Sequence, residues 1–505
     1  MRTTLRGATL LVACALLLTA CGPDAEATSG ATATSALPTQ APRPTAEPTA
    51  APSPTVPPNI AKNVRVADVN IGGESPEAAA GKLAEAFEAL SQPLELRLDE
   101  ATWTITPAQF GLKLPIDAMV ADARAAAANA RLPLQLDYDQ TRLRDLLEQI
   151  APDTARPAEV VVLTSTETLS RSFALAPAQR LDIDAAVKAI DRQLRDPDAP
   201  RRVELSLTDD ATATSKARPT PEQLQEQIRA LAQEWRGIAG VYVYDTESAQ
   251  PLAALNERTA FSAASTIKAA ILLNAYITLK EFDEAEEQDL EKMIVESDNL
   301  AANDMLAASI GGTTTEQAFE GADEMSDRLA SLGLETTYLY IPFEATDFIR
   351  IYKPSFRTGP ERDGQPPYTD SGRYLRTTPV EMAQLYIWLD QCANDKGMLL
   401  ERFSETLSAA RCKEMIDRLE QNGDKTRIVA GVSDKATVAH KSGWMDDTQG
   451  DVGLVRSPGG NYVLSIYVYR EIIPGKTLLA DEVATPAIAA FSRLVYSYYN
   501  PVVVR

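Results

Sequence analysis

Ser265 stands three residues before Lys268 in the stretch FSAASTIKAAILLNAY, at the start of an apolar, helix-forming run. If the serine lies in the first turn of that helix, Lys268 lies on the same face one turn further along, and its amine can reach the hydroxyl. A serine hydroxyl needs a base before it can attack a carbonyl. A desolvated lysine whose pKa is lowered by neighbouring cations can be that base. The pair predicts a nucleophile with its own base, although a Ser-x-x-Lys pattern alone arises by chance about once in a chain of this length.

Two further motifs follow in order along the chain. Ser297, Asp298 and Asn299 lie on an amphipathic helical pattern, MIVESDNLAANDMLAASIGG. A Lys-Ser-Gly motif at 441–443 precedes GDVGLVRSPGGNYVLSIYVY, which predicts two strands joined by a Pro-Gly-Gly turn. Ser-x-x-Lys, Ser-Asp-Asn and Lys-Ser/Thr-Gly in this order resemble the signature of penicillin-binding proteins and class A β-lactamases. The resemblance extends from about residue 219 to the C-terminus and includes the stretch RTTPVEMAQLYIWL.

The resemblance implies a role for each motif residue. Ser265 would be the acylated nucleophile, Lys268 its base, and Ser297 would pass a proton toward the leaving nitrogen. The oxyanion hole would consist of the backbone N–H groups of Ser265 and Trp444. The residues implied to bind the substrate are Asn299 for its amide side chain, Lys441 and Ser442 for its carboxylate, and Gly443 and Trp444 directly after them.

Two features of class A enzymes are missing from the sequence. Between Asn299 and Thr377 there is no Glu-x-x-Leu-Asn pattern, which in class A enzymes carries the glutamate that activates the deacylating water. Glu344 in IPFEATD lies in about the right place and Glu361 is a second candidate, but either can be a surface carboxylate. The class A arginine beyond the lysine motif has no counterpart, since Asp451 falls near its position. Without a deacylation base, penicillin would acylate the protein and stay, which is the behaviour of a penicillin-binding protein.

His440 is the single histidine of the chain, and no Cys-x-x-Cys motif occurs. This composition argues against a zinc site of the usual type, and we expect neither a metal nor a cofactor. A Ser-His-Asp hydrolase would have to use His440, so a generic esterase of that kind is the weakest alternative. Because His440 adjoins Lys441 on an expected strand, the two side chains should point to opposite faces, which favours a structural role for the histidine.

The N-terminus has the pattern of an export signal. Arg2 and Arg6 precede the apolar run ATLLVACALLL, which is shorter than the roughly 18 residues that cross a bilayer. The stretch LTAC, ending at Cys21, resembles the bacterial lipoprotein box, which implies removal of residues 1–20 and lipidation of Cys21. We expect a lipoprotein on the outer face of the cytoplasmic membrane or in the periplasm, with an ordinary secretory signal as the alternative.

Residues 21–60 are rich in Ala, Thr, Pro and Ser, so we expect a disordered, extended linker there. Cys14 would leave with the signal and Cys21 would carry lipid. Cys392 and Cys412 then remain in an exported, oxidising location. We expect a disulfide between them, with two buried free thiols as the alternative.

The sequence of residues 61–215 predicts an α+β domain. Ser75 and Pro76 begin a helix as N-cap and first-turn proline, and LELRLD with TWTITP predicts a pair of strands. The stretches VRVADVNIGGESPEAA, WTITPAQFG and ARPTPE resemble the peptidoglycan-binding type of domain found ahead of VanW-type proteins. That resemblance implies cell-wall glycan as a partner, and a spacer without a ligand is the alternative.

The net charge of −22 argues against nucleic acid as a partner, because phosphate binding needs a basic surface. We expect the α+β class throughout: an N-terminal domain at 61–215, then a class A β-lactamase-like domain at 216–505, with an antiparallel sheet flanked by helices and an all-helical subdomain. The expected function is a lipid-anchored serine hydrolase that is acylated at Ser265 by a β-lactam and hydrolyses it. The alternatives are a D-alanyl-D-alanine peptidase-like enzyme acting on peptidoglycan stem peptides, and a non-catalytic peptidoglycan-binding or sensor lipoprotein.

Overall fold

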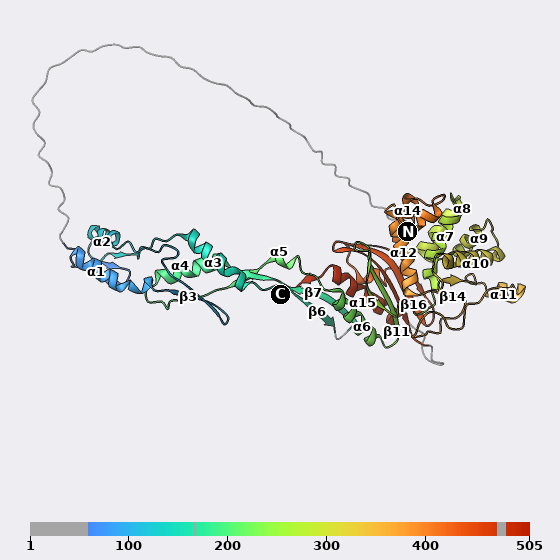
Figure 1. The fold of residues 1–505 in the computed structure, drawn as a ribbon, viewed down its shortest axis with the longest axis horizontal. Coiled ribbons are helices and arrows are strands. Elements are labelled where there is room, and N and C mark those ends of the chain that lie inside the picture. The colour runs from blue at the N-terminus through green and yellow to red at the C-terminus, as the bar shows by residue number, and fades with distance from the viewer. Residues whose placement is uncertain (1–58, 166–167, 472–480, 505) are drawn as a thin grey trace, which may run out of the picture. The chain divides into compact units, whose positions relative to one another are not determined.

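The computed structural model describes residues 59–165, 168–471 and 481–504 (Figure 1). The expected signal at 1–20, the lipidation site Cys21 and nearly all of the expected linker at 21–60 lie outside these residues. Within the described part of the chain, no helix combines the length and the apolar character that crossing a bilayer requires.

An antiparallel sheet forms the centre of the C-terminal part, with its strands in the order β12-β11-β17-β16-β15. Its long strands contain β-branched and aromatic residues, which suit a pleated, buried surface. Ser457 pairs with Gly460 at the turn between β16 and β17, so the hairpin predicted there is confirmed. The strands are β11 (Ile238–Asp245), β12 (Gln250–Leu255), β15 (Thr437–Trp444), β16 (Thr448–Ser457) and β17 (Gly460–Tyr469).

Helices cover both faces of this sheet, as Figure 1 shows. The neighbouring residues Val463 and Leu464 of β17 belong to different apolar clusters, because successive side chains of a strand point to opposite faces. One face packs against α6 (Pro221–Trp235) and α15 (Asp481–Tyr499). The expected sheet with flanking helices and a helical subdomain is therefore confirmed. The helices of the subdomain on the other face are α7 (Lys268–Thr278), α8 (Glu284–Glu291), α9 (Asn299–Ala308), α10 (Thr315–Ser331), α12 (Pro379–Ala393), α13 (Met398–Phe403) and α14 (Ala409–Glu420).

A long connection leads from α10 to α12 along the helical subdomain. It contains the short strands β13 (Tyr338–Leu339) and β14 (Leu375–Arg376), which pair in antiparallel fashion and so hold the two ends of the connection together. Between these strands lies α11 (Thr346–Tyr352). The segment directly after β13 carries Phe343 and Glu344, which enter the site described below.

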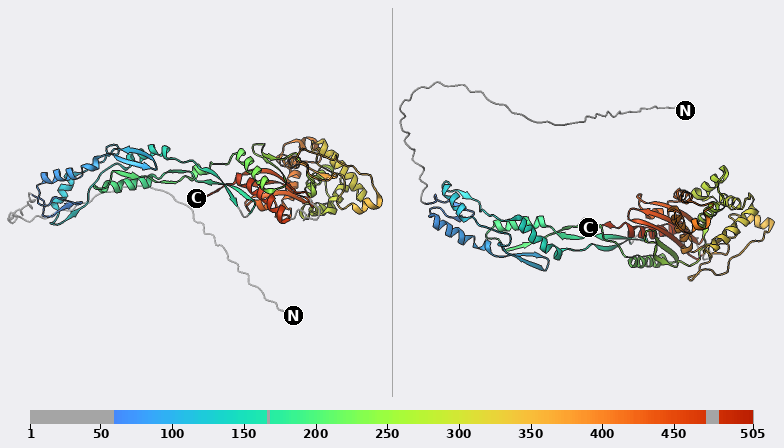
Figure 2. Two further views of the ribbon diagram at one scale, coloured as in Figure 1. Left: turned by 90° about the horizontal axis from the view of Figure 1, so that it is seen from below. Right: turned by 45° about the horizontal axis from the view of Figure 1, so that its top comes forward.

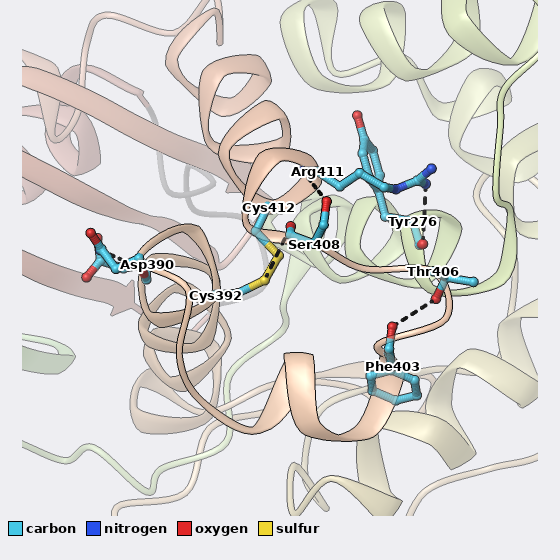
Figure 3. Close-up of a disulfide and its surroundings, with 9 residues drawn as sticks. Tyr276, Asp390, Cys392, Phe403, Thr406, Ser408, Arg411 and Cys412 are labelled. Atoms are coloured by element: carbon cyan, nitrogen blue, oxygen red, sulfur yellow. Dashed lines mark hydrogen bonds between the residues drawn. A yellow bond between two sulfur atoms is a disulfide. The ribbon is translucent and has the colours of Figure 1, made fainter.

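A disulfide joins Cys392 on α12 to Cys412 on α14 (Figure 3). The two Cα atoms are 5.8 Å apart, and both side chains are fully buried. The bridge closes the loop that contains α13 and ties two helices of the subdomain together. In the chain-entropy model a loop of this length stabilises the fold by about 3 kcal/mol.

Residues 59–215 contain two apolar cores rather than one. The first core packs around Val64 and Leu83, and the second around Leu96 and Ile190. The predicted cap at Ser75 is confirmed, since its hydroxyl accepts a hydrogen bond from Ala78 N at 3.2 Å, and so is the predicted pairing of β3 with β4. The elements are β1 (Arg65–Val66), β2 (Val69–Asn70), α1 (Pro76–Ala86), β3 (Leu94–Leu98), β4 (Ala101–Ile105), α2 (Ile116–Ala125), β5 (Arg131–Leu132), α3 (Gln140–Thr154), β8 (Gln179–Leu181), α4 (Ile183–Arg195), β9 (Arg202–Glu204), β10 (Leu207–Asp209) and α5 (Ala211–Thr214).

The hairpin of β6 (Glu159–Ser165) and β7 (Ser170–Ala176) packs on the C-terminal part of the chain. Phe173 belongs to the apolar cluster of α6 and α15, and its backbone N–H donates to Ser497 Oγ at 2.8 Å. The strand β18 (Val502–Val503) pairs in parallel with β7, which Figure 2 shows as teal strands beside the red C-terminal end. Sequence-distant segments thus complete the layer on the face of the sheet that carries α15.

Candidate active site

Ser265 lies in η2 (Ala264–Ile267), a 3-10 turn that leads directly into α7. Ala264 has a left-handed backbone with a φ of 45°, which non-glycine residues rarely adopt and which marks the sharp turn before the serine. Every residue of α7 from Lys268 to Ile277 is buried, as expected for a helix that is apolar on all sides. Packing on all sides holds Ser265 and Lys268 in one place relative to the sheet.

The amine of Lys268 is the nearest base to Ser265, with 3.0 Å between Nζ and Oγ. The Lys268 side chain has 0 % exposure. Burial lowers the pKa of Lys268 to about 7, and the charge of Lys441 acts in the same direction. The carboxylates of Asp298 and Glu344 oppose this shift. Lys268 can therefore be a neutral amine near pH 7, as a base for the serine hydroxyl must be.

The Ser-Asp-Asn motif lies at a break in the amphipathic helical pattern, and of its three residues only Asn299 falls within a helix, as the first residue of α9. A π-helical turn at Lys292–Glu296 ends the preceding helix, and Ser297 has a left-handed backbone with a φ of 60°. Asp298 then caps α9 by accepting a hydrogen bond from Ala301 N at 2.7 Å. An aspartate at this position competes with helix continuation because its side chain replaces a backbone acceptor.

This break places Ser297 between the two buried lysines. Its Oγ lies 3.2 Å from Nζ of Lys268 and 2.9 Å from Nζ of Lys441. Its backbone carbonyl also accepts a hydrogen bond from Lys268 at 2.6 Å. A hydroxyl that both accepts and donates, held between two amines, can relay a proton.

Lys441 on β15 forms the opposite side of the site. Its side chain is 1 % exposed, and its Nζ also donates to the carbonyl of Ser442 at 3.0 Å. Burial lowers the pKa of Lys441 to about 8, and the neighbouring Arg427 acts in the same direction, whereas the Asp451 and Asp424 carboxylates oppose it. Lys441 is therefore mainly charged at pH 7 and can attract an anionic group.

Gly443 allows β15 to approach the turn that carries Ser265. A Cβ at this glycine would lie 2.5 Å from the backbone N of Ser265, closer than Cβ atoms come to their neighbours. Trp444 is the next and last residue of the strand. The backbone N–H groups of Ser265 and Trp444 are the donors expected to form the oxyanion hole, and the indole of Trp444 is 64 % exposed.

Asn299 connects Lys268 to Glu344. Its Oδ1 accepts a hydrogen bond from Lys268 Nζ at 2.7 Å, and its Nδ2 donates to Glu344 Oε1 at 2.8 Å. Glu344, the first candidate for a deacylation base in the sequence, thus contacts Asn299. The structure brings all of the residues named from the three motifs to one site, and Glu344 lies at its edge.

Phe343 is a site residue that we did not single out in the sequence. Nζ of Lys268 lies 4.6 Å from the centre of its ring. Asn303 on α9 holds the backbone of Phe343 through two hydrogen bonds, from Asn303 Nδ2 to the Phe343 carbonyl at 2.8 Å and from Phe343 N to Asn303 Oδ1 at 2.9 Å. No signal in the sequence separates such a phenylalanine from one that only packs. Its place next to a candidate carboxylate in IPFEATD is the nearest hint.

Arg427 is a second residue that the motifs did not reveal. It is buried, forms an ion pair with Asp424, and donates to Gln449 Oε1 at 2.8 Å. Burial would raise the pKa of Asp424, but hydrogen bonds from Thr426 and the charge of Arg427 hold that pKa well below its usual range. The ion pair lies near Lys441 and places an arginine before the lysine motif, whereas the class A arginine follows that motif.

His440 points away from Ser265 and contacts Asp451. The two buried side chains are 2.8 Å apart between Nδ1 and Oδ1, and Asp451 also accepts a hydrogen bond from Ile428 N at 2.9 Å. Ser265 Oγ contacts the lysine amine instead. This arrangement agrees with a structural role for His440 in joining β15 to β16.

The site as a whole is a line of hydrogen-bonding groups from Ser265 through Lys268 and Ser297 to Lys441. It can move a proton along this line and hold an anionic group at its end. Across residues 59–165, 168–471 and 481–504, no group of three or more His, Cys, Asp and Glu side chains is arranged to hold a metal ion.

Comparison with known families agrees with this geometry. The family model described as "Beta-lactamase enzyme family" matches residues 223–284 and 286–499, more than half of the chain, and the chain belongs to this family. A comparison with curated proteins finds no match. The family confirms the superfamily of serine hydrolases that the three motifs predicted, whereas the role of each residue stays a prediction.

Several solved structures are similar to part of the chain. One is PBP-A, with 22% identity over 56% of this chain and 99% of that chain and a TM-score of 0.40. Another is a PBP-A mutant in an acyl-enzyme complex with penicillin G, with 23% identity, the same coverage and a TM-score of 0.39. A third is an ancestral class A β-lactamase, that of the last common ancestor of Gram-negative bacteria, with 22% identity over 54% of this chain and 98% of that chain and a TM-score of 0.38.

Proposed function

We propose that the protein is an exported serine acyl-transfer enzyme whose Ser265 is acylated by β-lactams and by D-alanyl amides of peptidoglycan stem peptides. The observation that carries this proposal is the line of contacts from Ser265 Oγ through Lys268 Nζ to Ser297 Oγ, at 3.0 and 3.2 Å. A nucleophile, a base with a lowered pKa and a proton carrier in one line are what acylation by an amide requires.

In the acylation step, the neutral amine of Lys268 takes the hydroxyl proton of Ser265 while Oγ attacks the carbonyl carbon of the substrate. The carbonyl oxygen becomes an oxyanion, which would accept hydrogen bonds from the backbone N–H groups of Ser265 and Trp444. The tetrahedral intermediate then collapses and the C–N bond breaks. The leaving nitrogen takes a proton from Ser297 Oγ, which regains one from the Lys268 ammonium, so one proton passes in total from Ser265 to the nitrogen.

The substrate would be held by charge and by hydrogen bonds to its amide. β-Lactams and D-alanyl peptides both carry a carboxylate close to the scissile amide. Lys441 and the hydroxyl of Ser442 would bind that carboxylate. Asn299 would donate to the amide side chain of the substrate through its remaining N–H.

The acyl-enzyme at Ser265 should hydrolyse slowly. The amine of Lys268 faces the apolar ring of Phe343, and the carboxylate of Glu344 takes a hydrogen bond from Asn299. A water molecule near the ester would therefore lack a dedicated carboxylate base. For this reason we favour the D-alanyl peptidase-like alternative over efficient β-lactam hydrolysis, which would need Glu344 to activate the water.

For the rest of the chain we propose a lipid anchor at Cys21, an extended linker over residues 21–60, and binding of cell-wall glycan by residues 61–215. The support is the lipoprotein box, the Pro- and Thr-rich composition and the motifs shared with the domain ahead of VanW-type proteins. Together these parts would hold the enzyme on the outer face of the membrane or in the periplasm, within reach of the wall.

The test is to incubate the full chain, purified in detergent, with penicillin and separately with a stem pentapeptide that ends in D-Ala-D-Ala. We expect one penicillin adduct per chain that lasts for hours, and release of D-alanine from the peptide. An adduct that decays within seconds would mean a β-lactamase. If no adduct forms and no D-alanine is released, the result would favour the non-catalytic sensor lipoprotein. Ser265→Ala is the control and should show neither signal.

A further inference from the structure

We propose that Glu344 is a positioning residue: it fixes the orientation of the Asn299 amide and thereby directs the lone pair of the Lys268 amine toward Ser265. This inference rests on the proposed acyl transfer at Ser265. It assigns to Glu344 a task in forming the acyl-enzyme, rather than the task of a water-activating base in breaking it.

The orientation of the Asn299 amide follows from the chemistry of its neighbours. An ionised carboxylate only accepts hydrogen bonds, so Glu344 Oε1, at 2.8 Å, selects the NH2 end of the amide. The oxygen end must then face Lys268, whose Nζ lies 2.7 Å from Oδ1. The flipped amide would set oxygen against carboxylate at one end and NH2 against amine at the other. Glu344 therefore locks one of two orientations.

The locked amide decides what the neutral amine of Lys268 can do. A neutral amine has two N–H donors and one lone pair. The backbone carbonyl of Ser297, at 2.6 Å, can only accept, and so can Oδ1 of the locked Asn299. These two acceptors occupy both donors. The lone pair is left for the remaining close neighbours, Ser265 Oγ at 3.0 Å and Ser297 Oγ at 3.2 Å, both of which carry a proton to give.

Phe343, the residue before Glu344, explains why Glu344 acts through the Asn299 amide and not as a base next to the amine of Lys268. Two hydrogen bonds from Asn303 fix the backbone of Phe343, whose ring covers Lys268. Glu344 follows with a left-handed backbone, φ 55°, and its exposed side chain reaches Asn299. The ring thus takes the place beside the amine, and the carboxylate acts on the amine through the amide.

The test compares acylation and deacylation rates of Glu344→Ala and Glu344→Gln in the full chain, with penicillin as the probe and intact mass as the readout. Glu344→Ala should slow acylation about 10-fold or more, the size expected for a lost charge-assisted hydrogen bond, and leave deacylation unchanged. Glu344→Gln, whose amide oxygen can still accept from Asn299, should recover part of that loss. Asp347→Ala removes a nearby exposed carboxylate that pairs with Arg350 instead, and should acylate at the wild-type rate.

A double-mutant cycle tests whether Glu344 acts through Asn299. In an Asn299→Ala background, Glu344→Ala should cause no further loss of acylation. Additive losses would overturn the proposal, and so would a normal acylation rate with slowed deacylation, which would make Glu344 the base. If the wild-type chain forms no adduct, the proposed function fails as well. If penicillin labels the wild type and acylates Glu344→Ala at the same rate, this inference is overturned while the proposed function stands.

Discussion

The ring of Phe343 lies over the amine of Lys268, with 4.6 Å between Nζ and the ring centre. An aromatic ring can stabilise a cation, but it can neither accept a proton nor orient a water as a carboxylate does. The residue that lies against the base therefore offers no group that could activate a water for hydrolysis of an acyl-enzyme.

Phe343→Glu should convert a persistent penicillin adduct into one that turns over. The Asn303 hydrogen bonds hold the backbone of residue 343, so the new carboxylate should lie near Lys268 and the ester. General-base assistance should then speed deacylation by about 100-fold. The decay of the adduct by intact mass is the measurement, with Phe343→Leu as the apolar control that should keep the long lifetime. An equally stable adduct in Phe343→Glu would contradict this account of slow deacylation.

The acylation rate should have a bell-shaped dependence on pH. Acylation needs Lys268 neutral, and its pKa is lowered to about 7, so the rate should rise as pH increases through that value. Binding of the substrate carboxylate needs Lys441 charged, and its pKa is lowered to about 8, so the rate should fall as pH increases further. Rates measured from pH 5 to about 10 at constant ionic strength check this prediction. A rate that is already maximal at pH 5 would contradict the role of Lys268 as base.

Gly443→Ala should lower both activity and stability. Its new Cβ would lie 2.5 Å from the backbone N of Ser265, so β15 must shift away from the nucleophile. We expect acylation to fall about 100-fold, as small misplacements in active sites do, and the free energy of unfolding to fall by about 1–3 kcal/mol. Gly81→Ala is the matched control because a Cβ there meets nothing within 4 Å in α1. It should leave acylation unchanged; equal behaviour of the two variants would count against the close approach.

Several features of the site follow from sequence and others depend on long-range packing. Ser265 and Lys268 could be paired because helix geometry fixes i and i+3 on one face. The break at Ser297 was missed because the amphipathic pattern continues on both sides of it, while one capping aspartate interrupts the helix. Phe343 was missed because only contacts with Asn303 and Lys268, distant in sequence, give it a role.

In the N-terminal part, too, the sequence predicted local features but not long-range packing. Local signals placed the cap at Ser75 and the pairing of β3 with β4. They did not indicate that residues 59–215 form two cores, because strand and helix patterns do not say which elements share a core. Nor did they indicate that Phe173 packs with α6 and α15, since these helices are distant in sequence and Ser497 of α15 is 324 positions from Phe173.

Removal of the disulfide should lower stability without removing the site. Cys392 and Cys412 join α12 to α14, and they are not members of the hydrogen-bonded line of Ser265, Lys268 and Ser297. Urea denaturation should show that the double variant Cys392→Ala/Cys412→Ala has a free energy of unfolding about 3 kcal/mol lower than the wild type. The folded variant should still be acylated. The wild type under a reducing agent should behave similarly. A variant as stable as the wild type would mean that the bridge does not constrain the unfolded chain.

The most direct test of the central claim is to locate the penicillin adduct in the chain. The full-length protein would be labelled with penicillin, digested, and its modified peptide sequenced by tandem mass spectrometry, beside Ser265→Ala and Lys268→Ala. We predict one adduct on Ser265, none in Ser265→Ala, and strongly slowed labelling in Lys268→Ala. A stoichiometric adduct on another residue, or labelling that survives the loss of Ser265, would contradict the assignment of Ser265 as the nucleophile.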